Sequence, residues 1–164
     1  MKKPKLYIET SILSYLTARR SRDLFIEANQ RLAAEFWNNH RKRFQLFVSD
    51  IVIREISRGD AVMAKLRLEA AKGIPLIEAD DHARKMAGEI IRRGILPEKA
   101  FIDASHIAVC CVHEIDFLLS LNFRHIANAF IHRRIEDVCK EFGYEPPVIC
   151  TLEQILEKEN RIDD

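Results

Sequence analysis

The 164-residue sequence is poor in glycine and proline, with five of each, and it contains no repeated segment and no tract of biased composition. We therefore expect neither a long linker nor a disordered tail. It also lacks the long apolar stretch of a signal peptide, and no apolar run reaches membrane-spanning length. These absences, with a length that fits one domain over residues 1–164, predict a single-domain protein of the cytoplasm without membrane contact.

Cysteine pairs with the spacing of a metal site are absent as well. The four cysteines include no C-x-x-C motif, and two of them are adjacent within an apolar, helix-like stretch. Buried free thiols are therefore the expected state, in preference to a zinc site or disulfides. The cysteines are Cys110, Cys111, Cys139 and Cys150.

The sequence has almost no excess of charge of either sign. A net charge of +1 excludes a polycation that coats nucleic acid with its whole surface. Affinity for nucleic acid would have to come from local basic patches, although each patch taken alone is more typical of a solvated helix face. The patches are Arg19-Arg20, Arg41-Lys42-Arg43, Arg92-Arg93 and Arg133-Arg134.

Short apolar runs alternate along the chain with segments of helical periodicity. This alternation predicts an α/β fold in which helices cover both faces of a parallel sheet. The predicted strands are residues 5–8, 45–48, 75–77, 117–119 and 148–150. The predicted helices are residues 12–18, a long helix capped by Ser21 that ends at 41–43, and then 50–58, 60–71, 80–94, 100–113, 131–142 and 151–160.

The long helix carries apolar residues at helical spacing, which predicts one buried stripe. The stripe comprises Leu24, Phe25, Ala28, Leu32, Phe36 and Trp37.

Four oxygen-bearing side chains lie close to predicted strand ends. Glu9 directly follows the first strand, and Asn122 comes after the fourth. Glu55 lies about a turn and a half into the helix after the second strand, and Asp103 opens the helix that leads into the fourth. Ligands of parallel α/β folds bind beyond the carboxyl ends of the strands. If the first and fourth strands are neighbours, all four side chains can converge there.

Carboxylates that gather without a lysine or arginine in the same motifs repel one another. At a separation of ~4 Å the repulsion is about 4 kcal/mol for an effective dielectric constant near 20. A divalent cation relieves this repulsion, and hard oxygen donors without cysteine favour Mg²⁺ or Mn²⁺. Each acid alone is more typical of a helix cap or an exposed charge, so the prediction of a metal site depends on their common location.

Four segments, in this order and spacing, resemble the motifs of PIN-domain proteins and together span nearly the whole chain. They are residues 7–16 (YIETSILSYL), 54–56 (REI), 101–108 (FIDASHIA) and 115–128 (IDFLLSLNFRHIAN). The resemblance implies a three-layer α/β/α domain with a five-stranded parallel sheet and a Mg²⁺-dependent ribonuclease site. Small PIN proteins also look like VapC-type toxins, which a cognate antitoxin holds inactive, and they commonly form homodimers.

On the family pattern Glu9, Glu55 and Asp103 fall on acidic positions, and Asn122 falls on the fourth. Two of these positions depart from the pattern. Glu9 is one methylene longer than the usual aspartate, and Asn122 replaces an aspartate, so one negative charge is missing although the amide oxygen can still bind a metal or its water.

The polar neighbours of these residues allow two interpretations. His106 and His125 each lie three residues after a predicted site residue, but Mg²⁺ prefers oxygen, so structural histidines are expected at both positions. The hydroxyls of Thr10, Ser11 and Ser120 fit the ordering of phosphate or metal-bound water and the capping of helices equally well.

The leading hypothesis is a metal-dependent endoribonuclease that acts on RNA, with Glu9, Glu55 and Asp103 holding Mg²⁺ (or Mn²⁺) and Asn122 orienting a water or a second ion. The second hypothesis, which Glu9 and Asn122 favour, is an inactive PIN-like module that binds RNA or protein. A phosphoacceptor receiver domain would share the sheet but needs an acidic pair and a lysine that are absent. If the protein is a homodimer, Phe36 and Trp37 fit a dimer contact, and core packing explains them at least as well.

Overall fold

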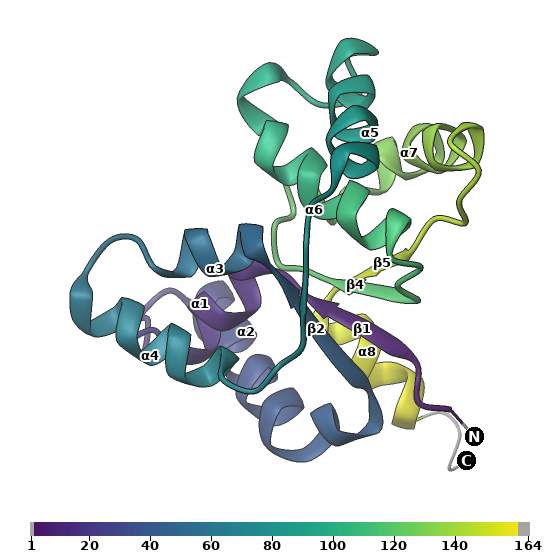
Figure 1. Ribbon diagram of the computed structural model, residues 1–164. Helices are drawn as coiled ribbons and strands as arrows, with labels where there is room; N and C mark the ends of the chain where they lie inside the picture. Colours follow the sequence, from purple (N-terminus) through teal and green to yellow (C-terminus); the bar gives the residue numbers. More distant parts are fainter. Residues whose placement is uncertain (1, 161–164) are drawn as a thin grey trace.

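The computed structural model describes residues 2–160. One five-stranded sheet lies at its centre, with the strand order β3-β2-β1-β4-β5 and every neighbouring pair parallel (Figure 1). The positions of the five predicted strands and their parallel arrangement are confirmed. The strands are β1 (Lys5–Ile8), β2 (Gln45–Ser49), β3 (Leu76–Ile77), β4 (Phe117–Leu119) and β5 (Val148–Cys150).

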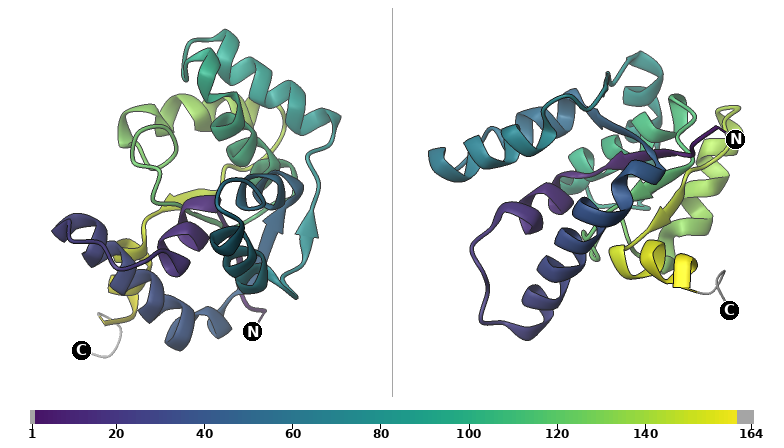
Figure 2. Two further views of the ribbon diagram at one scale, coloured as in Figure 1. Left: turned by 90° about the vertical axis from the view of Figure 1, so that its left-hand side faces the viewer. Right: turned by 90° about the horizontal axis from the view of Figure 1, so that it is seen from below.

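Helices cover the two faces of this sheet and give the predicted three layers. Figures 1 and 2 show α5, α6 and α7 on one face and α1, α2 and α8 on the other. The helices are α1 (Thr10–Thr17), α2 (Leu24–Glu35), α3 (Asp50–Ile56), α4 (Ala61–Ala71), α5 (Asp81–Arg92), α6 (Phe101–Val112), α7 (Ala129–Glu141) and α8 (Leu152–Asn160). Short turns of other helix types are η1 (Phe36–His40), η2 (Arg41–Arg43) and η3 (Glu98–Ala100).

Short polar side chains determine where several helices begin. Ser49 caps α3, Asp60 caps α4 and Asp80 caps α5, each by accepting a backbone N–H of the first turn. The predicted cap of the long helix is wrong by two residues, because Asp23 rather than Ser21 accepts the N–H of Ile26. A carboxylate also interacts favourably with the positive end of the helix dipole, which a serine does not.

The predicted buried stripe of the long helix is correct only in its second half. Leu24 is 84% exposed and Phe25 is 59% exposed, and Ala28 is exposed too. The N-terminal half of α2 extends beyond the sheet, so helical periodicity there has no core to face (Figure 2). Phe36 and Trp37 are buried in the core, so packing explains them and they are not available for a dimer contact.

The core surrounds β1, the middle strand, whose residues Leu6, Tyr7 and Ile8 are fully buried. All four cysteines are buried and free, as predicted. Within residues 2–160, no helix combines the length and the apolar character needed to cross a membrane.

Candidate metal centre

Glu9 lies at the carboxyl edge of the sheet because β1 pairs with β4. Its backbone N–H donates to the carbonyl of Leu119 (3.1 Å), and its side chain caps α1 by accepting the N–H of Ser11 (3.1 Å). The hydroxyls of Ser11 and Ser120 donate to the same oxygen, Oε2, the latter at 2.8 Å. Glu9 is only 4% exposed, so these three donors fix a buried carboxylate beyond the strand ends.

Glu55 lies on α3, the helix that follows β2. Its Oε1 accepts hydrogen bonds from the hydroxyl of Thr10 and from Nε2 of His106, both at 2.6 Å. Partial burial tends to raise the pKa of Glu55, but the hydrogen bond and charge of His106 and the hydrogen bond of Thr10 outweigh it and lower the pKa below its usual value. Glu55 therefore stays ionised near neutral pH.

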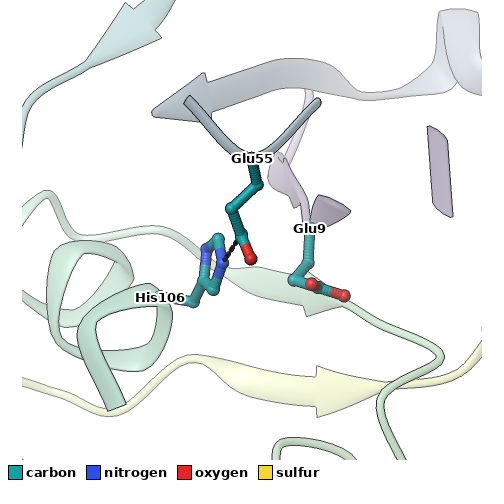
Figure 3. Close-up of side chains that lie close together, drawn as sticks. All are labelled: Glu9, Glu55 and His106. Carbon is teal, nitrogen blue, oxygen red and sulfur yellow. Dashed lines mark hydrogen bonds and ion pairs between the residues drawn. The ribbon is translucent and has the colours of Figure 1, made fainter. Parts of the chain in front are cut away.

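His106 lies on α6 and is completely buried. Its Nδ1 is 2.7 Å from the Tyr7 hydroxyl, which in turn lies 2.6 Å from the hydroxyl of Ser49. Burial alone would lower the pKa of His106, but the hydrogen bond to Glu55 and the nearby carboxylates of Glu9, Glu55 and Asp103 raise it. The ligand atoms of Glu9, Glu55 and His106 lie within 4.8 Å of one another (Figure 3).

Asp103 and Asn122 form a second group together with His125. The Asn122 amide donates to Asp103 Oδ1 (3.0 Å), and His125 Nδ1 donates to Oδ2 (2.7 Å). The Asn122 carbonyl oxygen accepts the backbone N–H of His125 (3.1 Å). Both carboxylate oxygens of Asp103 and the amide of Asn122 are thus engaged with protein partners.

Ser120 connects the two groups. Its hydroxyl donates to Glu9 and accepts the backbone N–H of Asn122 (3.0 Å). Asp103 is also one helical turn from His106 on α6. The adjacency of β1 and β4, on which the predicted convergence depended, is present. The structure brings Glu9 and Glu55 together with His106, and it places Asp103 with Asn122 in the adjoining group.

The Glu9–Glu55–His106 group fits a divalent ion. Glu9 Oε1 and Glu55 Oε2 accept no hydrogen bond from the described side chains or backbone, and neither carboxylate forms an ion pair with a described lysine or arginine, although the more distant charge of Arg58 also lowers the pKa of Glu55. Each carboxylate is therefore held by one oxygen and keeps the other available. Two carboxylates and an imidazole are ligands that Mg²⁺ or Mn²⁺ can use, alone or with water.

The hydrogen-bonded chain from Ser49 through Tyr7 to His106 was not predicted from the sequence. Tyr7 provides the one available signal, because a tyrosine between the apolar residues Leu6 and Ile8 of a buried strand needs a partner for its hydroxyl. His106, expected to be a structural histidine, does have a partner on both ring nitrogens, and one of these partners is Glu55.

The sequence matches the family model of the PIN domain over residues 6–131. The chain belongs to the PIN-domain family. No curated protein matches the sequence significantly. The predicted family is therefore confirmed by the family model.

Two solved structures show the same PIN-type fold. Mycobacterium tuberculosis VapC20, described as a sarcin-ricin loop cleaving toxin, matches with a TM-score of 0.55 and 17% identity over 74% of this chain and 93% of its own. VapBC2 from Rickettsia felis, bound to a DNA fragment from its promoter, matches with a TM-score of 0.53 and 12% identity over 90% of this chain and 98% of its own. At these identities the likeness establishes the fold.

Proposed function

We propose that the protein is a divalent-metal-dependent endoribonuclease that hydrolyses RNA and acts as the toxin of a toxin–antitoxin pair. The observation that carries the proposal is the pair of glutamates at the carboxyl edge of the sheet, each held by hydroxyls on one oxygen. Membership of the PIN family, whose members include nucleases, supports hydrolysis as the reaction. The toxin VapC20, which shares the fold, supports the biological role.

Each of the four predicted site residues has a part in this proposal. Glu9 and Glu55 would hold Mg²⁺ or Mn²⁺ directly, and Asp103 and Asn122 would act through water or on a second ion. When bound, the metal supplies charge neutralisation at the scissile phosphate and lowers the pKa of a water molecule. The protein's own contribution is orientation, because Thr10 fixes Glu55 while Ser11 and Ser120 fix Glu9.

The test is RNA cleavage by purified protein in the presence of Mg²⁺ or Mn²⁺. Glu9→Gln and Asp103→Asn keep the side-chain shape and remove one charge, so we expect cleavage to fall by about 100-fold or more in each. Glu136→Gln, an exposed glutamate on α7, is the matched control and should cleave like the wild type. Equal cleavage by all four proteins would identify a contaminating nuclease and contradict the assignment.

A non-enzymatic PIN-like module that binds RNA or protein is the second candidate function. One observation favours it: both oxygens of Asp103 are occupied by Asn122 and His125, and Asn122 brings no charge of its own. Isothermal titration with Mn²⁺ separates the two functions. An absence of binding at millimolar Mn²⁺ would favour the inactive module, whereas binding that Glu9→Gln abolishes supports the enzyme.

We further propose that a cognate antitoxin inhibits the protein by placing a basic side chain against the two glutamates, and that the protein is a homodimer. The fold shared with the VapBC2 assembly supports a protein partner. Expression of the toxin should arrest growth, and co-expression of a small neighbouring reading frame should relieve the arrest.

For the proposed homodimer, light scattering should give a mass of twice 19.1 kDa for the isolated protein. A monomer mass would contradict the dimer alone.

A further inference from the structure

We propose that His106 Nε2 is a direct ligand of the divalent ion, beside Glu9 and Glu55, and that the site therefore binds Mn²⁺ in preference to Mg²⁺. The inference rests on the metal site of the proposed function and is independent of RNA cleavage. It assigns a metal-binding role to a buried histidine that would otherwise only form hydrogen bonds with Tyr7 and Glu55.

The separations between the three side chains are close to those that one ion requires. Their ligand atoms come from three elements, the end of β1, helix α3 and helix α6, and lie within 4.8 Å of one another. Ligands ~2.1 Å from a common ion are about 3.0 Å apart at right angles and about 4.2 Å apart on opposite sides. The His106–Glu55 pair, now at 2.6 Å, needs to open by only a few tenths of an ångström to admit the ion.

The environment of the imidazole supports the tautomer that a metal requires. A ligating histidine uses one nitrogen for the metal and donates the N–H of the other to a partner that orients the ring. The Tyr7 hydroxyl lies at Nδ1 and the Ser49 hydroxyl lies behind it, and each hydroxyl can both donate and accept. Without an ion, Nε2 donates its hydrogen to Glu55. Once that proton leaves, the hydrogen-bonded chain can run from Nδ1 to Tyr7 and Ser49, and the lone pair of Nε2 would then be available to the ion.

Glu9 supplies the second indication that a cation belongs here. Its side chain is almost entirely buried and all three of its hydrogen bonds end on Oε2, while no hydrogen bond to Oε1 and no ion pair with an arginine or lysine is made by the described side chains of residues 2–157. The three donors offset part of the cost of burying this charge, and a cation at Oε1 would offset the rest. The imidazole of His106 is the neighbouring group that can complete a mixed oxygen and nitrogen ligand set.

The second histidine–carboxylate pair provides a comparison. His125 is 2.7 Å from Asp103, much like His106 beside Glu55, but Asn122 occupies the other oxygen of Asp103. Within the described part of the chain, no further acidic, histidine or cysteine ligand joins His125 and Asp103 in a comparable group. His125 is therefore a matched control, because it pairs with an acid but is not expected to bind the ion.

The ligand set determines the preference among metals. Mg²⁺ takes oxygen ligands and retains water, whereas imidazole nitrogen suits Mn²⁺ and the later divalent metals of the first row better. We expect the wild type to bind Mn²⁺ about tenfold or more tightly than Mg²⁺. His106→Gln offers an amide oxygen in place of the nitrogen, and should therefore lose most of this preference while still binding Mg²⁺.

Pulsed electron paramagnetic resonance of the protein with Mn²⁺ alone tests the ligand directly, because a coordinated imidazole gives a ¹⁴N coupling to the ion. The wild type and His125→Gln should both show the coupling, and His106→Gln should lack it. Incorporation of ¹⁵N-histidine into the wild type and into His125→Gln should convert the signal to that of ¹⁵N. Even if His106→Gln fails to fold, this labelling shows whether a histidine other than His125 binds the ion, and among the described residues His106 is the one grouped with Glu9 and Glu55.

Three outcomes would overturn the inference: bound Mn²⁺ without nitrogen coupling, coupling that persists in folded His106→Gln, or Mn²⁺ that stays fully aqueous. None of these readouts uses RNA. A nitrogen-ligated ion in a protein that cuts no RNA would refute the proposed reaction and leave the ligand assignment intact. RNA cleavage by a protein whose ion shows no nitrogen coupling would support the proposed reaction and refute the ligand assignment.

Discussion

At the scale of single residues, hydroxyl groups determine which carboxylate oxygens stay available. Ser11 and Ser120 occupy Oε2 of Glu9, and Thr10 occupies one oxygen of Glu55. Ser120 also accepts the N–H of Asn122, so one buried hydroxyl orients a residue in each of the two groups. Such outer partners of metal ligands contribute strongly to affinity even though they never touch the ion.

Ser120→Ala should therefore weaken Mn²⁺ binding by about 10- to 100-fold. The loss of a buried donor to Glu9 should also lower the free energy of unfolding by about 1–3 kcal/mol. Titration calorimetry and urea unfolding measure the two effects. Ser105→Ala is the control, because that serine is also buried but bonds only the carbonyl of Phe101 in its own helix. Equal Mn²⁺ affinity in both variants would contradict the orienting role of Ser120.

The same residues show how far the sequence predicts the site. Glu9 and Asn122 follow strand ends, so their common edge could be inferred from a parallel sheet alone. The pairing of Asp103 with His125 could not be inferred from the sequence, because it depends on the side-chain rotamers of a helix and a loop that are distant in sequence. His106 was expected to be a structural histidine, and it is buried with a partner on each ring nitrogen. That Glu55 is one of these partners could not be inferred from the sequence, because it depends on how α3 and α6 pack.

At the scale of elements, a cluster of ion pairs joins α5 to α7. Arg93, at the end of α5, bonds Glu89 of its own helix (2.6 Å) and pairs with Glu141 of α7. Hydrogen bonds from Arg92 and Arg93 lower the pKa of Glu89 to about 2, and Arg93 also lowers the pKa of Glu141. Arg134 of α7 donates in return to the carbonyl of Arg93 (2.9 Å).

These pKa shifts predict how the helix contact depends on pH. Because the folded-state pKa of Glu89 lies below the unfolded value of about 4.3, the stabilisation is present above that pH and is lost as pH falls toward 2. Arg93→Gln should lower the melting temperature at pH 7, and the difference from wild type should shrink between about pH 4.3 and pH 2.

Circular dichroism melts across this pH range measure the difference. Arg84→Gln is the control, since Arg84 pairs only with Asp81 on its own helix and both side chains are exposed. We expect little change from that variant. A difference for Arg93→Gln that stays constant down to pH 2 would contradict the assigned ion pairs.

Element boundaries were predictable where a short polar side chain marks them, as at Asp60 and Asp80. The exposure of Leu24 and Phe25 could not be predicted, because periodicity along a helix does not indicate where the sheet beneath it ends.

At the scale of the whole molecule, the three candidate ligands come from widely separated parts of the chain. An ion bound to Glu9, Glu55 and His106 would join the end of the middle strand to helices α3 and α6. Binding to the folded state alone would then stabilise the entire fold by mass action.

Free Mn²⁺ at 100 times its dissociation constant should stabilise the protein by about 2.7 kcal/mol. For a chain of this length that corresponds to a rise in melting temperature of about 5–10 °C. Differential scanning calorimetry should show the rise in the wild type and in Glu136→Gln, and its reversal by a chelator. An equal rise in Glu9→Gln would place the ion elsewhere.

The order of the strands also has a consequence during synthesis. β1 is made first, but it lies between β2 and β4, and Glu9 receives its bond from Ser120 only when β4 is in place. The site therefore forms late in synthesis: a nascent chain that ends before β4 carries Glu9, Glu55 and His106 but lacks the Ser120 hydroxyl that orients Glu9. The proposed metal site would therefore be complete only after β4, in the last third of the chain, has been made.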